Sequence, residues 1–250
     1  SRPRNWPGWP GSASRRCRHA SSPATTAGCS PARHAAGAAM TSFYPSGNSL
    51  QRAIRSLRQE DLGTFAYKLA SETGFRRVLL LERPLDDPIA DPAPALPVEF
   101  AALCAHEIDD YLVLRPDADR AHVAAHLASG WTCHVLRHEG RIVSACWRAD
   151  PPYWSSYLER TMPIADGDAY LTDAWTDAGY RGHALAHVLC LHQLRDLREK
   201  DFRRALRGTV PENRSALRAH AKSGFRPIAV LGRIRIGPWR GHFRREWREA

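Results

Sequence analysis

The stretch "DAGYRGHALAHVL" (residues 177–189) decides the fold, because the chain there turns from the end of a strand into a helix. Backbone N–H groups in the first turn of a helix have no partner within the helix and, together with the helix dipole, attract phosphate oxygens. Gly182 in this turn lets an anion approach the backbone closely. An isolated turn of this kind is more often an ordinary helix start, so the rest of the chain has to distinguish the two interpretations.

Length and composition are those of an ordinary globular chain. The 250 residues are 43% hydrophobic and 25% charged, which allows one or two domains with a sizeable core. No apolar run approaches the roughly 18 residues of a membrane span, so we expect a soluble protein that makes no membrane contact. The cysteines are scattered with no CxxC pair, which is typical of reduced, buried thiols in a cytoplasmic protein.

The positive charge is concentrated at one end. Residues 1–40 contain six arginines and no acidic residue, so they supply +6 of the formal net charge of +10. We interpret 1–40 as a disordered basic leader, either a transit peptide or sequence upstream of a native start near Met40. Residues 41–97 are expected to form an N-terminal helix-strand extension with a Pro-rich linker, and 98–250 the main domain.

Strand and helix patterns alternate along the chain. Helices are expected after Ser49 and at 98–108, 117–130, 180–199 and 212–225; strands are expected at 76–85, 110–116, 168–177, 202–210 and 227–237; a hairpin with its turn at Glu139-Gly140 is expected over 131–150, an aromatic loop over 151–163 and a solvated basic tail over 238–250. Interleaved elements of this kind predict an α/β chain with a mixed sheet covered by helices.

Two helix starts carry a family pattern. Arg181, Gly182, His183, Ala184, Leu185 and Ala186 fill an R/Q-x-x-G-x-G/A turn, and Asn213, Ala216, His220, Gly224 and Phe225 follow about thirty residues later. In this order the chain resembles the GNAT acetyltransferase superfamily over roughly 109–236. The resemblance implies a GNAT-like α+β fold: a mixed, mostly antiparallel central sheet flanked by helices.

Two residues depart from the family pattern. Ala184 replaces the middle glycine of the turn, where a helical φ would suit alanine and the backbone N–H remains. His220 stands where the family commonly carries the tyrosine that protonates the leaving thiolate; histidine also donates protons near neutral pH.

The resemblance implies acetyl-CoA, or another acyl-CoA, as the acyl donor. The pyrophosphate is expected on the amides of residues 182–186, with added charge from Arg181. The backbone around Trp175 and Thr176 is expected to pair with the pantetheine arm. Asn213 and Ser215 are expected to contact the cofactor arm or to cap their helix.

Acetyl transfer by direct attack of an amine requires a base and a proton donor. Asp173 and Asp168 are the candidate bases, with Asp173 favoured because strand alternation places it on one face with Trp175; a surface carboxylate is the alternative. His220 is the candidate acid, or an exposed helix residue. The aromatic residues expected to line the acceptor site, or to serve only in packing, are Tyr153, Trp154 and Tyr157.

These patterns predict an N-acetyltransferase that acts on a primary amine of a small molecule or peptide, as a monomer or homodimer. A GNAT-fold module that binds CoA without turnover is the alternative. A nucleic-acid partner is supported by charge alone. His183 and His187 have the spacing of a zinc-binding helix but lack the glutamate and a third ligand, so we predict no metal site.

Overall fold

The computed structural model describes residues 74–149 and 151–247. The predicted leader (1–40) and the helix expected after Ser49 lie outside the described residues.

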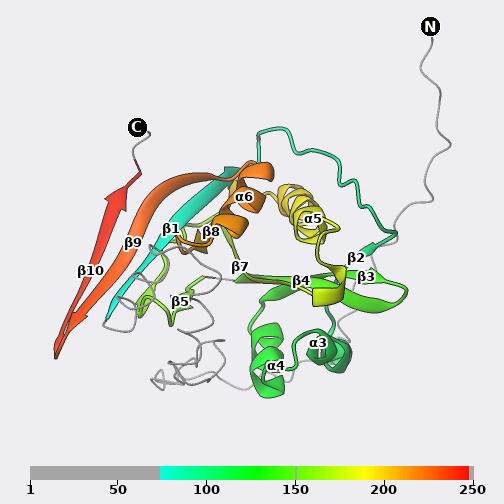
Figure 1. The fold of residues 1–250 in the computed structure, drawn as a ribbon, viewed down its shortest axis with the longest axis horizontal. Coiled ribbons are helices and arrows are strands. Elements are labelled where there is room, and N and C mark those ends of the chain that lie inside the picture. The colour runs from blue at the N-terminus through cyan, green and yellow to red at the C-terminus, as the bar shows by residue number, and fades with distance from the viewer. Residues whose placement is uncertain (1–73, 150, 248–250) are drawn as a thin grey trace, which may run out of the picture. The chain divides into compact units, whose positions relative to one another are not determined.

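The described chain is built on a single large sheet (Figure 1). Its strands are β1 (Phe75–Pro84), β2 (Glu99–Ala102), β3 (Thr132–His138), β4 (Arg141–Ala149), β7 (Asp168–Thr176), β8 (Arg204–Thr209), β9 (Arg226–Ile236) and β10 (Trp239–Glu246), in the order β10-β9-β1-β8-β7-β4-β3-β2. β7 and β8 pair in parallel, and the other neighbours pair antiparallel. A small hairpin, β5 (Trp154–Ser155) and β6 (Arg160–Thr161), is separate. The predicted mixed, mostly antiparallel sheet is confirmed.

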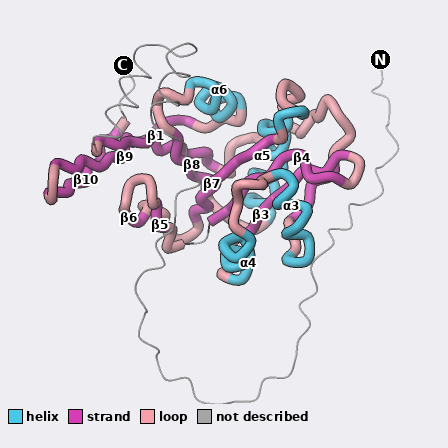
Figure 2. Tube along the Cα trace, turned by 60° about the horizontal axis from the view of Figure 1, so that its bottom comes forward, coloured by secondary structure: helices cyan, strands magenta, loops and turns pink. Residues whose placement is uncertain are grey.

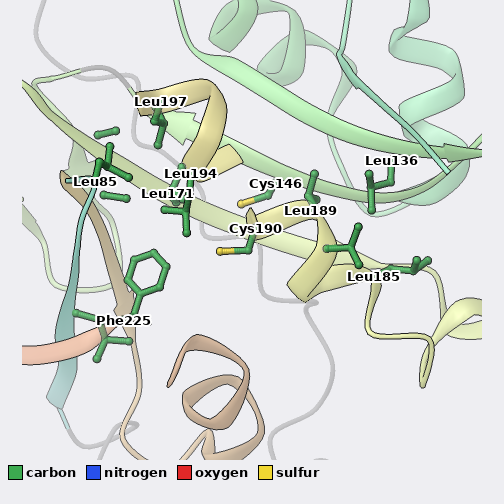
Figure 3. Close-up of a cluster of buried hydrophobic side chains, with 14 of the residues drawn as sticks. Leu85, Leu136, Cys146, Leu171, Leu185, Leu189, Cys190, Leu194, Leu197 and Phe225 are labelled. Carbon is green, nitrogen blue, oxygen red and sulfur yellow. The ribbon is translucent and has the colours of Figure 1, made fainter. Parts of the chain in front are cut away.

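Helices cover both faces of this sheet (Figures 1 and 2). α5 (Leu185–Glu199) and α6 (Arg214–Lys222) lie on one face, and α3 (Ile108–Leu114) and α4 (Arg120–Ala128) on the other. The apolar side of α5 packs on the sheet through buried leucines, with Phe225 at the margin of the cluster (Figure 3). A second cluster around Tyr111 and Trp147 fixes α3 against β4.

The parallel strands β7 and β8 diverge partway along their length. Their paired residues run from Asp168 with Arg204 to Leu171 with Arg207. Beyond that point β7 continues to pair with β4, and β8 continues to pair with β1. The sheet therefore opens between β7 and β8 on the side where β7 leads into α5.

Local sequence signals account for several elements. Glu139 and Gly140 have φ values of +50° and +79°, as the type I′ turn of a two-residue hairpin requires. The side chain of Asp119 accepts a hydrogen bond from Ala121 N–H and caps α4. β1, expected in the N-terminal extension, lies between β8 and β9 in the main sheet.

The secondary structure predicted for three segments was wrong. Residues 98–108, predicted as a helix, contain the edge strand β2 and a 3-10 turn. Residues 110–116, predicted as a strand, fall mostly in α3, whose buried residues Ile108, Tyr111 and Leu114 recur at helical spacing. The tail predicted to be solvated forms β10, which pairs with β9. The strand was missed because its partly buried residues, Gly241 and Phe243, alternate with exposed and mostly charged ones.

Three of the four cysteines among the described residues are as predicted. Cys133, Cys146 and Cys190 are free and buried. Cys104 is disulfide-bonded, so the prediction of a reduced thiol is wrong there. No helix in the described part of the chain is both long and apolar enough to cross a membrane.

Candidate active site

The turn between β7 and α5 is fastened to the neighbouring strand. Asp177 donates its backbone N–H to the Val143 carbonyl at 2.9 Å. Its carboxylate accepts hydrogen bonds from Gly179 N–H and from the Arg141 guanidinium, both at 2.8 Å. These contacts fix the position of the turn relative to the end of β7 and to β4.

The start of α5 presents a run of free backbone donors. Helical hydrogen bonding begins with His187 and Val188, which donate to the Ala184 carbonyl. Within 74–149 and 151–247, the N–H groups of residues 182–186 donate to no other residue. Gly182 has a φ of +89°, and a Cβ added there would meet no atom within 4 Å. Residues 182–184 and Ala186 are exposed and Leu185 is buried, and these amides, with the open space at Gly182, fit the pyrophosphate that the sequence predicts here.

Ala184 adopts a backbone conformation that the sequence did not predict. A helical φ was expected, but the residue is the N-cap of α5 with a φ of +57°. The left-handed region costs an L-residue about 1–2 kcal/mol, whereas glycine enters it freely. The alanine is therefore tolerated at a cost in stability.

Ala184→Gly is expected to raise the free energy of unfolding by about 0.5–1 kcal/mol, because relief of the left-handed strain outweighs the greater chain entropy of glycine when unfolded. Urea unfolding of both proteins measures the difference. Ala184→Val, which places a β-branched residue at the same φ, should shift stability in the opposite direction. If Ala184→Gly were less stable than wild type, the claim that the left-handed φ of Ala184 costs stability would be wrong.

The outer half of β7 presents the backbone predicted to bind the cofactor arm. Ser144 donates its hydroxyl to the Trp175 carbonyl at 3.0 Å and lies 3.0 Å from the Thr176 hydroxyl. These contacts come from the β4 side. On the opposite side β7 has already parted from β8, so this edge faces the opening in the sheet.

Asp173 lies at an irregularity of β7 and forms an ion pair. Its φ is +47°, and the register of β4 and β7 shifts at this point. Both carboxylate oxygens accept from Arg115 Nη1, at 2.8 and 2.9 Å. Arg115 is 1% exposed, also pairs with Asp117, and lies 4.5 Å from the Trp175 ring centre. Asp173 and Trp175 therefore both contact the Arg115 guanidinium.

Asp168, the other candidate base, lies at the opposite end of β7. It is 2% exposed and accepts two hydrogen bonds from Arg204 at 3.0 Å. It also accepts from the Ala165 N–H at 3.2 Å. These contacts fix the start of the strand, far from the turn.

His220 lies on α6 against a buried arginine. Its Nδ1 accepts a hydrogen bond from Arg207 Nη1 at 3.2 Å, since a guanidinium has no acceptor atom. Burial and the Arg207 charge lower the pKa of His220 to about 3. The neutral imidazole is therefore the form at neutral pH, whereas the predicted proton donor requires the imidazolium.

Two predicted cofactor residues, Asn213 and Ser215, lie at the start of α6, and a further contact ties the end of α6 to α5. Asn213 caps the helix, its side-chain oxygen accepting from Ala216 N–H at 3.0 Å, as one of the two expected roles requires. Ser215 is exposed in the first turn. His187 Nδ1 lies 2.9 Å from the Ser223 hydroxyl and ties α5 to α6.

The aromatic residues predicted to line the acceptor site differ in their surroundings. Tyr153 stacks on Tyr170 of β7, with ring centres 4.8 Å apart, and Tyr157 lies under Arg76. Both pack on the sheet. Trp154 is 47% exposed.

Sequence reasoning missed two buried arginines of this region, Arg115 and Arg207. Arg207 had a readable signal, since it shares the core-facing side of its strand with buried Ala205. Arg115 had none, because its partner Asp173 is 58 positions away.

Stability is expected to fall as the pH drops below the ordinary histidine range. Burial lowers the pKa of His126 from 6.5 to about 4, and that of His220 to about 3. Between these values and 6.5 the unfolded chain binds more protons than the folded one, so acid favours unfolding. Each of the two histidines contributes about 2 kcal/mol between about pH 7 and pH 5, so we expect a total loss of about 4 kcal/mol in urea titrations. His126→Gln should reduce that loss, and an equal stability at both pH values would refute the explanation.

Comparison with known proteins gives the family. The model of the acetyltransferase (GNAT) family matches residues 100–225. No curated protein matches. Similar solved structures include an acetyltransferase of the GNAT family from Novosphingobium aromaticivorans (18% identity, 64% of this chain and 65% of that one, TM-score 0.46). Two others are GCN5-related N-acetyltransferases. The one from Sphaerobacter thermophilus has 17% identity over 73% of this chain and 56% of that one, with a TM-score of 0.47. The one from Kribbella flavida has 20% identity over 65% of this chain and 59% of that one, with a TM-score of 0.45.

The matched regions cover between 56% and 65% of the length of these three structures. The family model, by contrast, spans half of the present chain, including the β7–α5 turn and α6. The chain belongs to the GNAT acetyltransferase family.

Proposed function

We propose that the protein transfers an acetyl group from acetyl-CoA to a primary amine of a small molecule or peptide. The observation that carries the proposal is the run of amides at 182–186 that donate to no described residue, in the turn that follows the part of β7 beyond its last pair with β8. The amides suit the pyrophosphate of acetyl-CoA, and the unpaired edge of β7 suits its extended pantetheine arm. Both belong to the same strand and the turn that follows it.

The donor-binding roles follow the geometry. The amides of 182–186 bind the pyrophosphate, and exposed Arg181 adds positive charge beside it. The free edge of β7 at Trp175 and Thr176 pairs with the amide groups of the arm, in the manner of an added strand. Asn213 orders the start of α6, and Ser215 lies beside it in the first turn.

The acceptor is attacked directly, without an enzyme-bound intermediate. The amine nitrogen adds to the thioester carbonyl, the C–S bond breaks, and the amine proton leaves. Both oxygens of Asp173 are engaged by a guanidinium. We therefore assign Asp173 to positioning Arg115 and β7, and release the amine proton to water. Tyr153, Trp154 and Tyr157 border the acceptor side.

A CoA-binding module without turnover is the second candidate. It is favoured by the neutral state of His220, which removes the predicted proton donor. For either candidate we propose a cytoplasmic location, one place where acetyl-CoA is available.

The test is release of free thiol from acetyl-CoA by the full chain against a panel of amines: polyamines, amino sugars, aminoglycosides and peptides with free N-termini or lysines. Turnover with one class identifies an enzyme and its acceptor. Calorimetric binding of acetyl-CoA without turnover across the panel would support the module instead. Absence of binding would refute both.

A further inference from the structure

Arg207 is a buried cation without an anionic partner in the described part of the chain. Its exposed fraction is 6%. Nη1 donates to His220 Nδ1 at 3.2 Å and Nη2 donates to Cys146 Sγ at 3.1 Å. Nε has no hydrogen-bond partner, and no carboxylate pairs with the side chain, among the described residues. A buried charge without a counter-charge is strongly destabilising, so this side chain indicates an anion that the protein binds.

The neighbours of Arg207 are neutral. Burial raises the pKa of the Cys146 thiol above its usual range, which keeps the sulfur protonated. His220 is uncharged, as described above. The Phe225 ring centre lies 5.6 Å from the Arg207 guanidinium carbon and adds no charge. No described residue supplies the counter-charge, so we look for it in a ligand.

The guanidinium lies where the two parallel strands part. Arg207 and Leu171 are the last paired residues of β8 and β7. Its contact Cys146 is on β4, on the far side of β7. The side chain therefore crosses the face of β7 next to Thr172, whose carbonyl accepts from the same Cys146 thiol at 3.4 Å.

The proposed donor site leads to this point, and the inference rests on that proposed function. From the amides at 182–186, an arm that follows β7 from Thr176 back to Thr172 travels about 13 Å at the usual rise of a strand. The arm of coenzyme A, with two amide groups between the pyrophosphate and the sulfur, is of similar length. Its sulfur then arrives beside Arg207.

We propose that Arg207 binds the thiolate sulfur that forms when the acetyl group leaves coenzyme A. The amine lone pair forms the new C–N bond, and the C–S bond breaks with its electron pair passing to sulfur. The amine proton goes to water. The thiolate is held by Arg207 and takes a proton from solvent as coenzyme A departs. A fixed positive charge thus replaces a proton donor on α6.

The test measures the pKa of the thiol of coenzyme A bound to the full-length protein, from the ultraviolet absorbance of the thiolate, with desulfo-coenzyme A as the blank. A guanidinium at contact distance should lower this pKa by about 1–2 pH units relative to free coenzyme A. Arg207→Met should restore the free value and reduce kcat about 100-fold. Arg207→Lys, which keeps the charge, should retain most of the pKa shift. Desulfo-coenzyme A should bind wild type and Arg207→Met equally.

The outcomes separate this inference from the proposed function. Failure of coenzyme A to bind wild type refutes both. Binding with an unshifted thiol pKa, or with a shift that survives in Arg207→Met, refutes the role of Arg207 alone. Because Arg207→Met removes an unpaired buried charge, its stability without ligand should equal or exceed that of wild type. Should it fail to fold, an unshifted thiol pKa in wild type still refutes the role, and Arg207→Gln then replaces Arg207→Met as the variant that must abolish the shift.

Discussion

Asp173→Asn is expected to lower the free energy of unfolding by about 3 kcal/mol, because it leaves the Arg115 guanidinium short of one of its charged partners. Arg115 is 1% exposed and donates hydrogen bonds to both carboxylate oxygens of Asp173. The pairing with Asp117 remains, so the loss should lie at the lower end of that seen when buried pairs are broken. Urea unfolding at constant pH measures it.

The matched control is a carboxylate in an exposed ion pair. Asp109 pairs with Arg120 on the surface, with side chains 76% and 55% exposed. Asp109→Asn should change stability by no more than about 0.5 kcal/mol. An Asp173→Asn protein as stable as wild type, but with an altered pH profile of kcat, would return Asp173 to the role of base.

Gly182→Asp is expected to weaken acetyl-CoA binding about 100-fold, which is about 2.7 kcal/mol. The added carboxylate would stand where the amides attract the pyrophosphate and would turn attraction into repulsion. Aspartate tolerates a positive φ better than most residues, so the turn should keep its shape. Calorimetric titration of acetyl-CoA into each protein gives the ratio.

Gly237 provides the control for this substitution. It also has a positive φ, +57°, and open space at its Cβ, but it lies in the β9–β10 turn. Gly237→Asp therefore introduces the same charge and similar backbone strain away from the proposed site. If both variants bind acetyl-CoA as wild type does, the pyrophosphate is not bound at Gly182.

The elements that the sequence predicted well have strong local signals. Asp119 and Gly130 bound α4, and Glu139-Gly140 makes the hairpin turn. α3 was missed because seven residues hold only two helical turns, too few for the period to stand out beside a β-like run of Leu and Val. β10 was missed because arginines dominate its exposed face.

The candidate site was predictable only where one segment makes it. The amides at 182–186 follow from the strand-turn-helix pattern, but the left-handed φ of Ala184 does not, because it depends on where α5 begins. The Arg115–Asp173 pair and the contacts of Arg207 join distant segments, so no local pattern reports them.

The most direct measurement of the central claim is hydrogen–deuterium exchange of the full chain with and without saturating acetyl-CoA, with saturation established by calorimetry. Binding of the pyrophosphate by backbone N–H groups predicts that exchange at residues 182–186 slows at least about tenfold, while the β9–β10 turn at Gly237 is unaffected. Unchanged exchange at 182–186 in a protein that has bound acetyl-CoA would contradict the account, because the pyrophosphate would then bind elsewhere.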